Sequence, residues 1–152
     1  MQISEHFTLA ELMRSQLAQR KGINNLPGPE HVANLELLCK EVLEPLRTLY
    51  GKPIRISSGY RSAALNKLVG GSAASHHCSG MAVDIDQGSA KENMRIFNLL
   101  KAFGYFSQLI FEFGTLENGP DWVHVSYERD DLKREMLRAV KVGNKTQYLK
   151  YK

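Results

Sequence analysis

Two histidines and an aspartate, in two short segments, are the residues of this sequence best suited to chemistry. The first segment, 75–84, contains His77 and ends at Asp84, and the second is Asp121-Trp122-Val123-His124. Two imidazole nitrogens and one carboxylate suit a zinc ion and leave one coordination position open for water. A further carboxylate, Asp121, lies three residues before the last histidine and could take that water's proton. This combination is typical of a hydrolytic metal site.

Two predicted strands explain how these side chains could meet. Residues 81–86 and 122–127 both have the alternation of a strand, which places Asp84 on one face of the first and His124 on one face of the second. Gly80 allows the loop that carries His77 to fold back over the sheet, because glycine adopts backbone conformations closed to other residues. If the two strands are neighbours, all three candidate ligands converge on one sheet face.

Neighbouring residues leave other assignments open. His76 competes with His77 as a ligand, and Asp86 lies on the same strand face as Asp84 but roughly 7 Å further along. Cys78 could act as a nucleophile with His76 or His124, which would make the protein a cysteine hydrolase. Such a cysteine usually starts a helix that lowers its pKa, whereas Cys78 precedes a strand, so we expect it to be incidental.

The remaining segments predict an α+β protein with a small, mostly antiparallel sheet and helices packed on one side. Capping boxes at Thr8–Glu11 and Ser89–Glu92 predict the starts of two helices, 8–20 and 89–103. A longer apolar pattern predicts a helix over 30–50 with a break at Pro45. The other predicted elements are strands at 54–58, 108–113 and 146–149, a short helix after residue 62, and a last helix over 130–140.

Size and composition bound the class of protein. The 152 residues fit one domain, with helices 8–50 as scaffold, the chemical motifs in 54–127 and a basic tail over 129–152. This tail holds eight Lys/Arg against three Asp/Glu and so carries a charge of +5, while the preceding 128 residues sum to −1, which gives the net charge of +4. No nucleic-acid motif accompanies it, so we expect a solvated end and no nucleic-acid partner. Cys39 and Cys78 form no paired motif, and Cys39 is expected to pack in the core.

The start of the chain has no basic and apolar signal segment, and no apolar run reaches the roughly 20 residues of a membrane span. We therefore expect synthesis in the cytoplasm without a signal peptide, and no transmembrane segment.

An ordered set of motifs resembles the D-alanyl-D-alanine metallopeptidases. The motifs are Ser58-Gly59-Tyr60-Arg61-Ser62, then Asn66, then Ser75-x-His77-x-x-Gly80-x-Ala82-x-Asp84, then Trp122-x-His124-x-Ser126. The family includes zinc DD-carboxypeptidases, D-alanyl-D-alanine dipeptidases and phage L-alanyl-D-glutamate endolysins, and it shares its fold with the hedgehog signalling domain. The resemblance covers about residues 54–127.

This resemblance implies the roles of individual residues. It implies zinc ligation by His77, Asp84 and His124, a catalytic carboxylate at Asp121 and a substrate-facing arginine at Arg61. Zinc and the Arg61 guanidinium would stabilise the developing oxyanion. Four further residues are expected to line the cleft or contact substrate: Ser75, Gln108, Glu112 and Trp122. Glu112 is expected to orient a ligand or to contact substrate.

The resemblance also implies a function, a monomeric zinc peptidase that cuts a peptide bond of bacterial peptidoglycan. Its partner is the peptidoglycan stem peptide, and the bond is either D-Ala-D-Ala or L-Ala-D-Glu. A phage or prophage lysis enzyme is expected, acting on the cell wall after release or carried in the virion. The alternative is a non-catalytic zinc-binding or virion structural module of the same fold.

Overall fold

Six strands form one sheet in the order β1-β2-β4-β3-β5-β6 in the computed structural model, which describes residues 1–152. All neighbouring strands are antiparallel except β3 and β5, which are parallel. The strands are β1 (Ile56–Ser58), β2 (Ala82–Ile85), β3 (Gln108–Glu112), β4 (Trp122–Ser126), β5 (Glu135–Val142) and β6 (Lys145–Lys150). The predicted α+β class with a mostly antiparallel sheet is confirmed.

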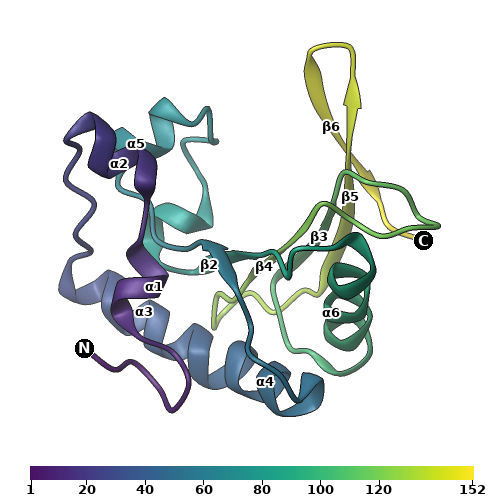
Figure 1. The fold of residues 1–152 in the computed structure, drawn as a ribbon, viewed down its shortest axis with the longest axis horizontal. Helices are drawn as coiled ribbons and strands as arrows, with labels where there is room; N and C mark the ends of the chain where they lie inside the picture. Colours follow the sequence, from purple (N-terminus) through teal and green to yellow (C-terminus); the bar gives the residue numbers. More distant parts are fainter.

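Six α-helices accompany the sheet. They are α1 (Leu9–Met13), α2 (Gln16–Lys21), α3 (Pro29–Leu38), α4 (Glu44–Tyr50), α5 (Ala63–Leu68) and α6 (Ala90–Phe103). Figure 1 shows α3, α4 and α6 on one side of the sheet and α5 on the other. A core of 23 buried residues joins the helices to the sheet. No helix has the length and apolar character needed to cross a membrane.

The predicted helix over 8–20 is two helices rather than one. The Thr8–Glu11 capping box is confirmed, but α1 ends at Met13. Ser15 then starts α2, because its hydroxyl accepts a hydrogen bond from the backbone N–H of Ala18 at 3.1 Å. Asn25 satisfies the end of α1 by donating its side-chain amide to the Met13 carbonyl at 2.7 Å. A polar cap in the middle of an apolar pattern therefore divides the segment.

The long predicted helix is continuous but irregular at the expected place. A π-helical turn, Cys39–Leu43, separates α3 from α4, and Pro45 lies in the first turn of α4. Proline has no N–H to donate and its ring crowds the preceding turn, so the wider turn before it relieves the clash. Cys39 is fully buried in the core, as predicted, and burial raises the pKa of its thiol to about 12.

Helix α6 matches the predicted span, but its second capping box is only half formed. The Ser89 hydroxyl accepts from the Glu92 backbone N–H at 3.2 Å. The Glu92 carboxylate does not accept from the Ser89 backbone N–H, as a full capping box requires. It accepts from the Tyr50 hydroxyl and pairs with Arg95 at 3.1 Å. Tertiary contacts with α4 thus override the local cap.

The predicted helix over 130–140 is wrong, because β5 occupies most of that segment, whereas the predicted strand over 146–149 is confirmed as part of β6. The two strands form a hairpin in which Val142 pairs with Lys145 across Gly143-Asn144. Figure 1 shows this hairpin projecting from the sheet. The helix prediction fails because β5 is held by parallel pairing with β3, from Gln108 opposite Glu135 to Glu112 opposite Ala139. Such a distant pairing leaves no local signal.

Candidate active site

The structure brings His77, Asp84 and His124 together. Their potential ligand atoms all lie within 4.8 Å of one another. Asp84 on β2 is directly opposite His124 on β4 in the antiparallel ladder, and His124 Nδ1 is 3.1 Å from Asp84 Oδ1. His77 Nε2 is 3.3 Å from the same oxygen. The two predicted strands are therefore neighbours, and the three side chains meet on one face.

His77 reaches this face because of the turn that follows it. It lies in a short 3-10 helix, His76–Ser79, which ends at Gly80 in a left-handed conformation with φ of 74°. A Cβ atom at Gly80 would lie 2.5 Å from the carbonyl oxygen of His31. Both the positive φ and this close approach require glycine, so the loop folds back over the sheet only with this residue.

One hydrogen bond fixes the His77 ring. Its Nδ1 is 2.7 Å from the Gly59 carbonyl oxygen, and since a carbonyl only accepts, Nδ1 carries the proton. The lone pair of Nε2 then faces Asp84 and is free for a metal ion. The side chain is buried, with 2% of it exposed. This is the arrangement in which metal-ligating histidines are commonly held.

The separations of the three side chains fit a tetrahedral metal ion. Two ligand atoms about 2.05 Å from zinc at the tetrahedral angle lie roughly 3.3 Å apart. The observed separations from Asp84 Oδ1 are 3.1 and 3.3 Å. Burial by itself would raise the pKa of Asp84, but the imidazoles of His77 and His124 outweigh it and hold that pKa well below its usual range. Asp84 is thus an ionised carboxylate between two nitrogen donors.

A cleft of about 610 Å³ opens over these three residues. The loop 69–76 lies along it, and so does the β5–β6 hairpin, which contributes Lys141, Thr146 and Tyr148. The four residues predicted to contact substrate, Ser75, Gln108, Glu112 and Trp122, all line it. The cleft is therefore wide enough for a ligand and carries polar groups along its length.

Two of these lining residues have visible partners. The Ser75 hydroxyl accepts from the His77 backbone N–H at 3.2 Å, so it holds the histidine loop. Gln108 donates its side-chain amide to Glu135 at 2.9 Å, at the start of β5. Both side chains thus help to shape the cleft.

Glu112 is the buried carboxylate of the cleft. It is 7% exposed and lies at the end of β3, opposite Trp122, while Ile110 two residues before it lies opposite His124. Burial, together with the nearby Asp84 carboxylate, raises the pKa of Glu112 to about 7. Glu112 can therefore exchange a proton near neutral pH.

The structure does not bring Asp121 into this cleft. Asp121 lies in the bend just before β4 and is not among the residues that line the cleft. The residue is exposed and lines a separate cavity of about 230 Å³ with Asp86. Its carbonyl accepts from the side-chain amide of Asn93 at 2.9 Å, which ties this point to α6.

Arg61, which the resemblance implies as a substrate-facing residue, lines the cleft. Its backbone N–H donates to the His77 carbonyl at 3.1 Å. The guanidinium Nε is buried and has no hydrogen-bond partner. A buried donor without a partner costs free energy unless a ligand supplies an acceptor.

His76 and Cys78 have other surroundings. His76 lines the cleft, but its Nε2 lies 3.5 Å from the Glu128 carboxylate rather than near Asp84. Cys78 does not line the cleft, and burial raises the pKa of its thiol. A raised pKa reduces the thiolate fraction, so the protein offers no activated cysteine there.

The sequence analysis missed the hairpin residues of the cleft, Lys141, Thr146 and Tyr148. One local signal could have found them, because Gly143-Asn144 between two alternating segments is a typical hairpin turn.

The arrangement defines a class of protein, an α+β fold in which three residues that could hold a metal ion line an open cleft. A model of the family described as Peptidase M15 matches residues 5–126, which is most of the chain. This chain therefore belongs to the peptidase M15 family, a family of metallopeptidases. The match ends at β4 and leaves the β5–β6 hairpin outside it. No curated protein sequence matches the chain.

Proposed function

We propose that the protein is a zinc-dependent peptidase that hydrolyses a peptide bond of bacterial peptidoglycan. One observation carries this proposal: two imidazole nitrogens and one carboxylate oxygen converge, with tetrahedral separations, in the cleft of a peptidase M15 chain. His77, Asp84 and His124 would hold the zinc ion. Bound zinc would supply Lewis-acid activation of the attacking water and of the scissile carbonyl group.

The protein's own proton acceptor in this proposal is Glu112. Its carboxylate lines the same cleft as the three ligands, and its burial raises its pKa in the metal-free protein, which favours a carboxylate that accepts a proton readily. Glu112 would take the proton of the attacking water and pass it to the leaving amine. Asp121, the residue that the resemblance implies for this role, lines a different cavity. We therefore assign the role to Glu112.

Arg61 would bind the carbonyl oxygen of the substrate as negative charge develops on it. The unpartnered Nε of its guanidinium supports this role, because a substrate oxygen would satisfy the buried donor. An electrostatic contribution of this kind is usually worth about 3 kcal/mol of barrier.

The substrate would be an extended peptide rather than a folded protein. The cleft is bounded by the loop 69–76 and by the hairpin, and Trp122 packs on Phe113 with ring centroids 5.3 Å apart. This leaves a long opening with polar walls, which suits the stem peptide. The bond cut would be D-Ala-D-Ala or L-Ala-D-Glu, and the enzyme would act as a monomeric phage or prophage lysis enzyme, after release or from the virion.

The proposal is tested by incubating the zinc-loaded protein with purified peptidoglycan and measuring the release of new amino groups. We expect release that a chelator abolishes, that added zinc restores and that iodoacetamide leaves unchanged. Mass spectrometry of the fragments then identifies the bond. No release by fully zinc-loaded protein would overturn the proposal in favour of a non-catalytic zinc-binding module. Release that survives chelation would overturn the role of the metal.

A further inference from the structure

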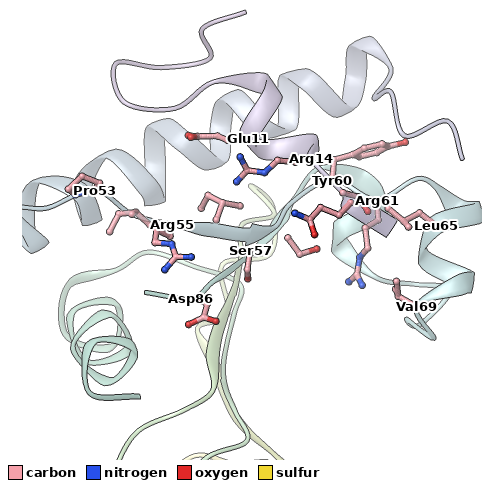
Figure 2. Close-up of a pocket in the computed structure, with 15 residues that line it drawn as sticks. Glu11, Arg14, Pro53, Arg55, Ser57, Tyr60, Arg61, Leu65, Val69 and Asp86 are labelled. Carbon is pink, nitrogen blue, oxygen red and sulfur yellow. The ribbon is translucent and has the colours of Figure 1, made fainter. Parts of the chain in front are cut away.

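A second cavity lies on the other side of Arg61. It has a volume of about 580 Å³ and lies along β1, between that strand and the segment Glu11–Gln16 (Figure 2). Arg61 and Val69 line both this cavity and the cleft over His77, Asp84 and His124, which we call the metal cleft. A ligand in the cleft could therefore continue past Arg61 into the second cavity.

Three arginines give this cavity its character, and we call it the arginine pocket (Arg14, Arg55 and Arg61). In Figure 2, Arg14 comes from the end of α1 and Arg55 from the chain before β1, while Arg61 lies on the side of Val69. The guanidinium groups are spread along the strand rather than gathered at one point. This spacing suits an extended ligand better than a single small anion.

None of these guanidinium groups has an acidic partner. The lysine and arginine side chains that form ion pairs are those of Lys52, Arg95 and Lys133. Neither Arg14 nor Arg55 donates a side-chain hydrogen bond to any protein group, and Arg61 Nε is buried without a partner. Arginine binds carboxylates through two parallel hydrogen bonds, so three unpaired guanidinium groups in one cavity favour an anionic ligand.

The two acidic residues of the cavity, Glu11 and Asp86, form no ion pair with its arginines. The Glu11 carboxylate accepts from the Thr8 backbone N–H at 3.3 Å within its capping box. The Asp86 carboxylate accepts from the Gly88 N–H at 2.9 Å and from Asn93 at 3.1 Å. Both carboxylates are thus held by the protein's own donors, and the arginines keep their capacity for a ligand.

The strand beside the pocket adds a second reason to expect an extended ligand. β1 is the end strand of the sheet and pairs only with β2, so its other edge has no strand partner. The edge of a sheet is a common binding place for an extended peptide.

We propose that the arginine pocket binds a carboxylate-bearing segment of the peptide substrate, in extended form, on one side of the bond that is cut. This inference rests on the proposed peptidase function and assigns Arg14 and Arg55 to substrate specificity. They lie outside the metal cleft and affect binding rather than the chemical step.

The experiment compares two synthetic stem peptides that share the scissile bond. One has free carboxylates and the other has those carboxylates amidated. We expect the zinc-loaded protein to cleave the free-carboxylate peptide with about tenfold higher kcat/KM, because a charge-assisted hydrogen bond contributes on the order of 1.5 kcal/mol. The double variant Arg14→Gln/Arg55→Gln should lose this preference through a higher KM, with kcat nearly unchanged.

A matched control removes the same charge elsewhere. Arg20 and Arg129 are exposed and line neither cavity, so Arg20→Gln/Arg129→Gln should keep the preference. Equal kcat/KM of the unmodified protein for both peptides would overturn the pocket's role, and so would equal losses in the two double variants. Cleavage of neither peptide would instead show that the peptidase proposal itself fails, and this inference with it.

Discussion

Two pairs of carboxylates lie in very different surroundings. Asp84 and Glu112 line the metal cleft, where neighbouring imidazoles lower the pKa of Asp84 and burial raises the pKa of Glu112. Asp86 and Asp121 line the smaller cavity beside α6. The Asn93 amide donates there to the Asp86 side chain and to the Asp121 carbonyl.

The difference teaches that burial and neighbours, rather than residue type, give a carboxylate its chemistry. In the first pair one group is kept ionised and the other is kept ready to hold a proton, and such a separation of pKa values is typical of acid–base sites. In the second pair the Asp86 carboxylate and the backbone carbonyl of Asp121 accept from Asn93 and so join the sheet to α6. Substitutions in the two pairs should therefore have different consequences.

The largest effect is expected for Asp84→Asn. The substitution keeps the size of the side chain but removes the charge that binds a cation between two imidazoles. We expect the zinc content, measured by plasma mass spectrometry, to fall from about one per chain to near zero, with at least about a hundredfold loss of activity. Asp86→Asn is the matched control and should keep both the zinc content and the activity of the unmodified protein. Equal zinc content in the two variants would contradict this view of the cleft.

The next effect concerns stability and pH in the metal-free protein. The pKa of Glu112 is raised from 4.5 to about 7, so the folded protein holds a proton that the unfolded chain releases. The free energy of unfolding should therefore fall as pH rises from about 4.5 to 7, by roughly 3 kcal/mol. Glu112→Gln removes this penalty.

Urea unfolding at two pH values measures this dependence of stability on the protonation of Glu112. The variant's stability relative to the unmodified protein should increase by about 3 kcal/mol between pH 4 and pH 8. A difference that does not change with pH would show that Glu112 has an ordinary pKa in the folded protein.

A smaller effect is expected at Asn93, which is 1% exposed. Besides its bonds to Asp86 and Asp121, its side-chain oxygen accepts from the Gln87 N–H at 2.7 Å. Asn93→Ala removes these hydrogen bonds of a buried side chain and should lower the free energy of unfolding by about 2 kcal/mol without loss of zinc. Asn98→Ala, at an exposed position of the same helix, is the control for urea unfolding. Loss of zinc in Asn93→Ala would show that the surroundings of Asp86 and Asp121 also support metal binding, which would contradict the contrast between the two pairs.

Much of the central sheet could be predicted from the sequence, because its strands carry local signals. The alternation of Val123 and Val125 with His124 predicts β4, and the apolar residues of 108–113 predict β3. The N-caps Thr8 and Ser89 likewise predict the starts of two helices. These signals also place Asp84 and His124 on strand faces, from which their meeting follows once the strands pair.

The remaining features depend on contacts between distant residues. The parallel pairing of β5 with β3 turned a segment with helix-like spacing into a strand, and this brought Lys141 and Tyr148 to the cleft. The face occupied by Asp121 depends on where β4 begins, and its distance from His124 in sequence could not fix this. The burial of Glu112 likewise appears only when the hairpin covers that end of β3.

The most direct test of the account is to compare Glu112→Gln with Asp121→Asn in zinc-loaded protein, with kcat/KM on peptidoglycan fragments as the measurement. Loss of the proton acceptor should lower the value for Glu112→Gln by about 10² to 10⁴-fold, and Asp121→Asn should stay within about twofold. Zinc content near one per chain in both variants would show that the metal site is intact. The opposite outcome, an inactive Asp121→Asn and an active Glu112→Gln, would contradict the account.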